Sequence, residues 1–361
     1  MNILDMLGLS SEGTEKKNIK EKRRKKQTQN AKATSNSPSL FDFFDFDIFN
    51  LKEATVIDEK QVYVPQEKKK FSLNPLNLLG NLGKLVFKRN YTYSKAPAPL
   101  SVKDAIKNNI NIIQVLNKLK MEGRMATRNE QTKLSRFIGW GTISELFSGK
   151  RYVSEYQQLK NLVTPEELEK IKTSSLTSFY TPYEVATWIW KILLRMGFCG
   201  GNILDPSAGT GLFEMTANKD LLDDSMMTLI EMDSITGNIL ENLMQTATVY
   251  KKPYQEVRLR ENSFDLAISN IPFGDVMVYD SEEKQTRTIH NFFFSKTARV
   301  VREGGIIAFI TSRYFLDAKD SKLRAKLSEN YNLVAAFRFN NMTFSDANTE
   351  VVSDLVILQK T

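Results

Sequence analysis

From residue 178 onward, short apolar segments alternate with segments of helical periodicity, and this alternation constrains the fold more than any other feature. The apolar segments are "GNILD", "MMTLIEMD", "SFDLAISN", "GGIIAFITS", "NLVAAFRF" and "SDLVILQ". Between them, segments such as "YEVATWIWKILLRMGF" place apolar side chains on one helical face. Strands separated by helices form mostly parallel sheets that are covered on both faces. The pattern predicts an α/β domain over residues 178–361, with ligands at the carboxyl ends of the strands.

Residues 101–177 show a purely helical pattern. "SVKDAIKNNINIIQVLNKLKMEG" begins with Ser101 as a cap and continues with apolar residues at helical spacing. A second helix is expected from about Thr127 to Phe137. Another begins at "TPEELEKI", with Thr164 as cap and Pro165 as the first helical residue. We therefore expect a small helical subdomain before the α/β domain.

The first hundred residues differ from the rest in composition. Residues 15–39 are basic and polar, which predicts disorder and indicates either a DNA-attracting arm or a solvated tail. The next stretch, "SLFDFFDFDIFNL" (Ser39 to Leu51), interleaves acidic and aromatic residues. It suits a docking peptide for a partner protein, or equally an element packed on the main domain. The remainder to Leu100 is interpreted as a basic linker, and the arm and linker together favour DNA as a partner.

Several classes of protein are excluded by what the chain contains. One cysteine, Cys199, and one histidine, His290, argue against a disulfide framework and against a metal centre built from these residues. No apolar run reaches the length of a membrane span, and "MNILDMLGLS" lacks the basic start of a signal peptide. We expect a cytoplasmic protein with neither metal nor membrane partner. The formal net charge of +8 favours a polyanionic partner.

A glycine-containing turn follows the first predicted strand, in "DPSAGTGLF". Gly209 and Gly211 would let the backbone approach a ligand closely, and no Lys-Ser/Thr follows as in a phosphate-binding P-loop. Asp205, before the turn, suits an amine-bearing ligand. Glu231, at the end of the next strand, is placed to accept hydrogen bonds from ribose hydroxyls. A ligand with a ribose, an amino-acid end and a positive centre is S-adenosylmethionine.

A second unusual turn ends a later strand, in "AISNIPFGD". Taken alone, this is a strand that runs into a Pro-Gly turn. However, it lies at a predicted strand end, as the glycine turn does. This shared position favours a functional interpretation of the stretch over a plain turn.

The order of "FYTP", "DPSAGTG" and "NIPF" resembles the gamma-type methyltransferases that modify adenine N6 in DNA. Three further stretches, "ATRNEQTKLSRFIGWGTISELF", "TIHNFFFSKTARVVREGGIIAFITSRYFLD" and "NTEVVSDLVILQK", resemble the methylase portion of large helicase–methylase proteins of phages and mobile elements. The resemblance covers about residues 101–361. It implies a class I S-adenosylmethionine-dependent methyltransferase fold, which is Rossmann-like with a seven-stranded, mostly parallel sheet. It also implies a bacterial or phage enzyme that acts in the host cytoplasm.

By this resemblance, the side-chain oxygen of Asn270 and the backbone carbonyl of Ile271 accept the two N6 hydrogens of a flipped adenine. Pro272 fixes the turn, and Phe273 stacks on the base. Most such enzymes have Pro at the position of Ile271, and many have Tyr at that of Phe273. The carbonyl is present whatever the side chain, and stacking does not need the hydroxyl, so both departures should be tolerated.

The resemblance also implies a set of cofactor contacts, in which Thr181 and Asp205 hold the methionine end. Asp233 could instead be a helix cap, and Glu256 a surface residue. His290 is interpreted as a cap or a core residue. The candidate ligands of S-adenosylmethionine are Tyr180, Thr181, Asp205, Ser207, Gly209, Gly211, Phe213, Glu231, Asp233 and Glu256.

Three functions are consistent with these motifs. The first is methylation of adenine N6 in DNA, and the second is methylation of an RNA base or of a Gln side chain in a protein. The third is a non-catalytic DNA-binding or decoy protein that has kept the fold. The intact Asp205, Asn270 and Phe273 argue against the third, and the resemblance to proteins of mobile elements favours DNA.

Overall fold

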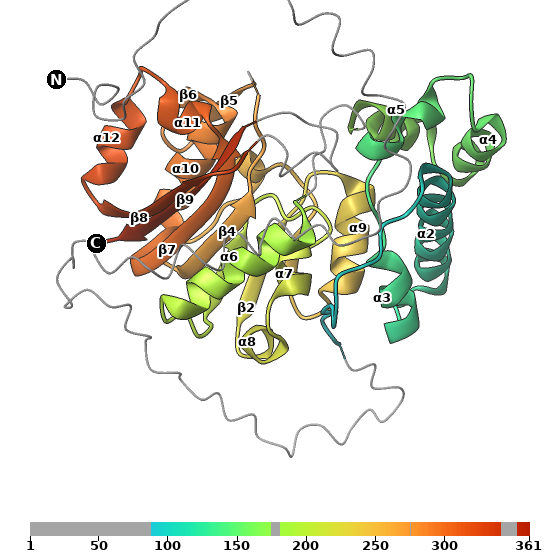
Figure 1. Ribbon diagram of the computed structural model, residues 1–361, viewed down its shortest axis with the longest axis horizontal. Coiled ribbons are helices and arrows are strands. Elements are labelled where there is room, and N and C mark those ends of the chain that lie inside the picture. The colour runs from blue at the N-terminus through green and yellow to red at the C-terminus, as the bar shows by residue number, and fades with distance from the viewer. Residues whose placement is uncertain (1–87, 175–180, 275, 341–351) are drawn as a thin grey trace, which may run out of the picture. The chain divides into compact units, whose positions relative to one another are not determined.

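A computed structural model of the protein describes residues 88–174, 181–274, 276–340 and 352–361, all of them within one unit (Figure 1). Seven described strands form a single sheet in the order β3-β2-β1-β4-β7-β9-β8. Strand β9 runs antiparallel to β7 and β8, and every other pair is parallel. The mostly parallel sheet predicted from the sequence is therefore confirmed. The strands are β1 (Asn202–Asp205), β2 (Met226–Ile230), β3 (Thr248–Tyr250), β4 (Phe264–Asn270), β7 (Val301–Ser312), β8 (Tyr331–Arg338) and β9 (Ser353–Lys360).

The basic arm, the acidic–aromatic segment Ser39 to Leu51 and Tyr180 lie outside the described residues. The predictions made for them stay predictions. Among the helices that the structure describes, none is long and apolar enough to cross a membrane.

Strand β1 pairs with β2 on one side and with β4 on the other, so the winding of the chain reverses between β1 and β4. In open α/β sheets the crevice at such a reversal is the place where ligands bind. Asp205 is the last residue of β1, and Asn270 is the last residue of β4. The topology therefore brings the two sequence motifs to the same edge of the sheet.

Helices cover the sheet on both faces, and α6 lies in front of it in Figure 1. Because both faces of the central strands are covered, the sequences of these strands are continuous apolar runs. Ile306 to Ile310 of β7, for example, are fully buried. The helices of the α/β domain are α6 (Tyr183–Arg195), α7 (Leu212–Thr216), α8 (Lys219–Asp223), α9 (Ser234–Leu243), α10 (Ile289–Val300), α11 (Tyr314–Asp317) and α12 (Lys322–Ser328), with a short 3-10 helix, η4 (Tyr254–Glu256).

The preceding segment is helical, and its caps are those that the sequence predicts. The Ser101 hydroxyl accepts a hydrogen bond from the Asp104 amide, and Thr164 and Glu167 bond each other reciprocally. The second predicted helix ends three residues early, at Leu134. The elements are α2 (Val102–Glu122), α3 (Arg128–Leu134), the 3-10 helix η3 (Gly141–Phe147), α4 (Val153–Leu162) and α5 (Pro165–Ser174).

Buried hydrogen bonds join the helical segment to α9 of the α/β domain. The Asn242 side chain accepts from the Ala126 amide at 2.8 Å, and the Gln245 side chain donates to the Ala126 carbonyl at 2.7 Å. Part of the segment assigned to the linker is also bonded to this domain. The amides of Tyr91 and Tyr93 donate to the carbonyls of Leu243 and Met215.

Between β4 and α10 the chain forms a two-stranded antiparallel hairpin, β5 (Met277–Asp280) and β6 (Gln285–Thr288). The sequence analysis did not predict this hairpin, because "QTRT" has no apolar run. It begins four residues after Phe273, and its second strand leads directly into α10.

Candidate active site

Asp205 lies fully buried at the end of β1. One of its carboxylate oxygens, Oδ1, accepts from the Ser207 amide at 2.9 Å and from the Ser269 hydroxyl at 2.7 Å. The other, Oδ2, is buried without a hydrogen-bond partner in the described part of the chain. Burial raises the pKa of Asp205 to about 7. An amine-bearing ligand would satisfy the unpaired oxygen and favour the ionised form.

The glycine turn follows, and both of its glycines are in the left-handed region, at φ +55° for Gly209 and φ +83° for Gly211. A Cβ atom on Gly211 would lie 2.8 Å from Cδ1 of Leu240, so a side chain there would collide with α9. The absence of a side chain on Gly211 thus allows the turn to pack closely against α9.

Glu231 follows β2 and is tied to this turn. Its Oε2 accepts from the Gly209 amide at 2.9 Å, and its Oε1 accepts from the Asp233 amide at 2.7 Å. Burial, the largest cause, raises the pKa of Glu231 to about 7, even though these amides favour the ionised form. Each oxygen keeps a second lone pair with which to accept from a ribose hydroxyl. Asp233 caps α9 by accepting from the Thr236 amide at 2.7 Å, so the cap interpretation holds for one of its oxygens.

Asn270 ends β4, beside Ile310 of β7. Its side-chain oxygen is buried and has no hydrogen-bond partner among the described residues. Ile271 is fixed by its amide, which donates to the Ile310 carbonyl at 3.0 Å, and its side chain is buried. Pro272 and Phe273 are partly exposed. The turn that follows β4 thus presents one covered acceptor and one partly exposed aromatic ring.

The structure links the two motifs through Ser269, which the sequence analysis missed. Ser269 precedes Asn270 and donates its hydroxyl to Asp205. Its signal in the sequence is a hydroxyl in the middle of a buried apolar strand, since such a group needs a polar partner.

A second missed residue is Glu214, on α7. It is 1% exposed, and neither of its carboxylate oxygens has a partner in the part of the chain that the structure describes. Burial, with a further contribution from the charge of Asp205, raises the pKa of Glu214 well above its ordinary value. Its signal is an acidic residue within the apolar run "GLFEM".

For the remaining predicted cofactor residues that the structure describes, it gives positions but no side-chain hydrogen bond to Asp205 or Glu231. Ser207 contributes its amide to Asp205, and Thr181 is partly exposed just before α6. Phe213 is buried, and its carbonyl accepts from the Trp190 indole at 2.7 Å. Glu256 is exposed on η4. Within the described ranges, no group of three His, Cys, Asp or Glu residues could hold a metal ion.

The strand order, with an antiparallel last strand inserted between β7 and β8, defines a class I S-adenosylmethionine-dependent methyltransferase fold. The residues at the switch point of the sheet, where the winding of the chain reverses between β1 and β4, fit that cofactor. The unpaired oxygen of Asp205 suits an ammonium group, and the carboxylate of Glu231 suits ribose hydroxyls.

Comparison with known proteins agrees with this class. Residues 210–344 match the Eco57I restriction-modification methylase family. The chain is 28% identical over 192 residues to the Defense against restriction protein B of Escherichia phage P1, a match that covers 52% of this chain and 8% of that protein. It is 26% identical over 179 residues to the Type II methyltransferase M.XamI of Xanthomonas campestris pv. amaranthicola, covering 43% of this chain and 34% of that enzyme.

Two solved structures are similar to this chain at lower sequence identity. A putative class I S-adenosylmethionine-dependent methyltransferase of Listeria monocytogenes has a TM-score of 0.45 and 16% identity, over 72% of this chain and 88% of the other. The methyltransferase subunit of a type I restriction-modification system from Streptococcus thermophilus has a TM-score of 0.45 and 12% identity, over 70% and 66% of the two chains.

Residues 210–344 are thus similar to methylases of the restriction-modification type, the chain is similar to a methylase-containing phage protein, and its cofactor is S-adenosylmethionine. The matched region spans well under half the length of each curated relative.

Proposed function

We propose that the protein methylates the N6 amine of adenine in DNA. The observation that carries this proposal is the side-chain oxygen of Asn270, which is buried at the end of β4 without a partner. A buried polar atom without a partner is costly, so such an atom at the end of β4, beside the reversal of the strand order, is a candidate contact for a ligand.

The chemistry needs an acceptor at this place. The lone pair of the adenine amine is delocalised into the ring, so the amine is a poor nucleophile. The oxygen of Asn270 and the carbonyl of Ile271 would accept its two hydrogens and stabilise the charge that develops on nitrogen. S-adenosylmethionine, when bound, supplies an electrophilic methyl group. The excess proton leaves to water, so this mechanism does not require a general base.

The base must leave the stack to reach Asn270. Phe273 follows two residues after Ile271 and is partly exposed, so its ring is accessible for stacking. Because the Asn270 oxygen is covered from solvent, the side chains that cover it must move when the base arrives.

DNA is favoured over RNA or a protein Gln side chain by the restriction-modification family and by the Type II methyltransferase among the relatives. The same proposal places the enzyme with bacterial or phage DNA in the cytoplasm. Incubation with labelled S-adenosylmethionine and separate pools of DNA, RNA and protein tests the substrate class. Label that appears only in RNA or protein would replace this proposal with the corresponding alternative.

The role of Asn270 is tested by Asn270→Ala. The rate of methyl transfer to single-stranded DNA should fall about a hundred- to a thousandfold, while calorimetry shows unchanged affinity for S-adenosylmethionine. Asn332→Ala is the control, because Asn332 is exposed on β8. If Asn270→Ala turns over at a near-normal rate, Asn270 is a turn residue and the catalytic assignment is wrong.

A further inference from the structure

The β5–β6 hairpin exposes apolar side chains directly after the catalytic turn. Val276, Met277 and Tyr279 are 54%, 59% and 58% exposed. Met277 and Tyr279 alternate along β5, so they share one face of the hairpin. On the other face, Asp280 is buried. The hairpin therefore turns an apolar face to solvent and a charged residue inward, the reverse of the usual arrangement.

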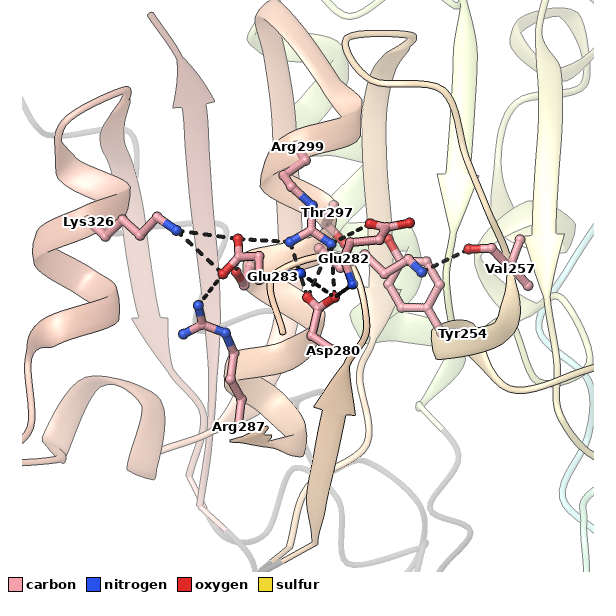
Figure 2. Close-up of polar contacts among 11 residues, drawn as sticks. Tyr254, Val257, Asp280, Glu282, Glu283, Arg287, Thr297, Arg299 and Lys326 are labelled. Atoms are coloured by element: carbon pink, nitrogen blue, oxygen red, sulfur yellow. Dashed lines mark hydrogen bonds and ion pairs between the residues drawn. The ribbon is translucent and has the colours of Figure 1, made fainter. Parts of the chain in front are cut away.

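This exposure is not the result of a loosely held loop, because the hairpin is fastened by ion pairs (Figure 2). Arg299 of α10 reaches the carboxylates of Asp280 at 3.1 Å and Glu283 at 2.8 Å. Glu283 also binds Arg287 of β6, and Lys326 of α12 at 3.3 Å. Since these bonds join the hairpin to two helices, its exposed face is held in one position.

A second exposed group follows β7, the strand that pairs with β4. Strand β7 ends at Ser312, and Arg313 and Tyr314 follow; both are exposed, Tyr314 by 59%. The Arg313 guanidinium lies over the Tyr314 ring, 5.3 Å from its centre. Because β7 is the neighbour of β4, this pair emerges beside the strand that ends at Asn270.

Helix α10 connects the two exposed groups. The amide of Ile289 donates to the Val276 carbonyl at 2.8 Å, which joins the start of α10 to the base of the hairpin. One residue later, the His290 ring meets Phe315 of α11 edge-on at 6.4 Å between centres. Figure 1 shows β5, β6 and α11 at the same end of the sheet, where the strands β4 and β7 finish.

The charges around this surface favour a polyanion. Lys284 at the hairpin turn and Lys319 after α11 are exposed. The neighbouring acids Glu282 and Asp317 are bonded by Arg299 and by Arg338 at 2.6 and 2.8 Å. Exposed basic side chains therefore stand beside exposed aromatic rings at this surface, the combination with which proteins hold single nucleic-acid strands.

We propose that Val276, Met277, Tyr279, Arg313 and Tyr314, here named the strand surface, bind the DNA strand that carries the target base. Tyr279 and Tyr314 would stack on bases left unpaired beside the flipped adenine, and Arg313 would contact a phosphate. This inference rests on the function proposed above, since it concerns the same substrate. The strand surface would hold the DNA while Asn270 and Phe273 act on one base.

The test measures binding of a fluorescent, adenine-containing single-stranded oligonucleotide by anisotropy. Tyr279→Ala and Tyr314→Ala should each weaken binding about tenfold, whereas Tyr279→Phe, which keeps the ring, should bind as the wild type does. Arg313→Ala should lower the slope of log affinity against log salt by about 0.7, the value for one phosphate contact on a single strand. Leu333→Ala is the control, since Leu333 is equally exposed, at 57%, on β8. Affinity for S-adenosylmethionine should be unchanged in every variant.

The outcomes separate this inference from the proposed function. If the wild type methylates DNA and the two Tyr→Ala variants bind within twofold of it, the strand surface is wrong and the function stands. If the wild type binds S-adenosylmethionine but neither binds nor methylates DNA, both proposals fall. If Tyr279→Ala instead dissociates a dimer and leaves oligonucleotide affinity unchanged, the surface is an interface between copies, and the inference is overturned.

Discussion

The pKa values of two sets of acids in this protein, all of them partly or fully buried, are shifted in opposite directions. On the hairpin, Glu283 is bonded to Arg287 and Arg299, and these bonds outweigh its burial and lower its pKa to about 2. At the switch point of the sheet, burial dominates and raises the pKa of Asp205 and of Glu231 to about 7. Asp205 is fully buried, whereas Glu231 and Glu283 are both partly exposed. The opposite pKa shifts of Glu231 and Glu283 therefore follow from the absence or presence of a basic partner.

This comparison distinguishes acids that stabilise the fold through ion pairs from acids without a basic partner, which are candidates for binding a ligand. A buried ion pair whose members are both present is complete, and removing one member leaves an uncompensated charge. A buried acid without a basic partner lowers stability when it is ionised, and acids of this kind cluster at functional sites. The hairpin acids belong to the first set, and the switch-point acids to the second.

Breaking the first set should have the largest effect on stability. Asp280→Ala would remove the buried carboxylate of this cluster, and Arg299 would keep its pairs with Glu282 and Glu283. The loss of unfolding free energy should therefore stay below the roughly 3–5 kcal/mol that breaking an isolated buried pair typically costs. Urea denaturation followed by circular dichroism measures this. Asp223→Ala is the control, since it removes a surface pair with Lys219 and should leave the midpoint unchanged. Equal midpoints for the two variants would remove the distinction between the sets.

The second set should make the stability of the cofactor-free protein depend on pH. The pKa of Asp205 rises from 3.8 to about 7 on folding, and that of Glu231 from 4.5 to about 7. Their contribution is fully present below about pH 4 and is lost as the pH rises through 7, at about 1.4 kcal/mol per pKa unit for each group. Glu283, with a lowered pKa, loses its contribution only below its ordinary value of 4.5. The window from pH 5 to 8 therefore excludes Glu283 and reports the acids whose pKa is raised, which are Asp205, Glu231 and Glu214.

Unfolding free energies measured over that window should fall with pH in the wild type and fall less in Asp205→Asn. Saturating S-adenosylmethionine should also flatten the curve, because its ammonium group would favour the ionised form of Asp205. A flat curve for the cofactor-free wild type would show that these acids are solvated or paired, contrary to the comparison.

Glu231→Ala tests whether an acid of the second set binds the cofactor. Loss of a charged acceptor should weaken S-adenosylmethionine binding by about 1.5–3 kcal/mol in calorimetry. Because Glu231 also holds the Gly209 and Asp233 amides, Glu231→Gln is the matched variant. It keeps one acceptor oxygen and should lose less. Unchanged affinity in both variants would exclude Glu231 from the cofactor site.

The parts of the fold predictable from the sequence are those in which burial alone determines the pattern. The β7 run from Ile306 to Ile310 is apolar because both faces are covered, so its strand was evident. Strand β3 was not predicted, because its three residues, Thr248–Tyr250, make no apolar run. The β5–β6 hairpin was missed because ion pairs between residues distant in sequence, such as Asp280 and Arg299, fasten it.

The site divides in the same way. Gly209 and Glu231 were predicted from motifs at strand ends, and the structure joins them by a hydrogen bond. Ser269 was missed, because its partner Asp205 is 64 residues away, and only the pairing of β1 with β4 brings them together. Glu214 was missed because an acid in a short helix gives no periodic signal; its burial is a result of packing.

Substitution of Glu214 should have the smallest effect on stability and on cofactor affinity. It tests whether Glu214 belongs with Asp205 and Glu231 among the acids expected to bind the cofactor. Burial raises the pKa of Glu214 well above the ordinary value, which favours the protonated form, and Glu214→Gln replaces that form with a neutral group of nearly equal size. Unfolding free energy at pH 7 should change by less than about 1 kcal/mol, and S-adenosylmethionine affinity should not change, in contrast to Asp205→Asn. Glu214→Leu should even stabilise the protein slightly, because it removes two buried oxygens without partners. A tenfold loss of cofactor affinity in Glu214→Gln would instead show that Glu214 is ionised and binds the cofactor beside Asp205.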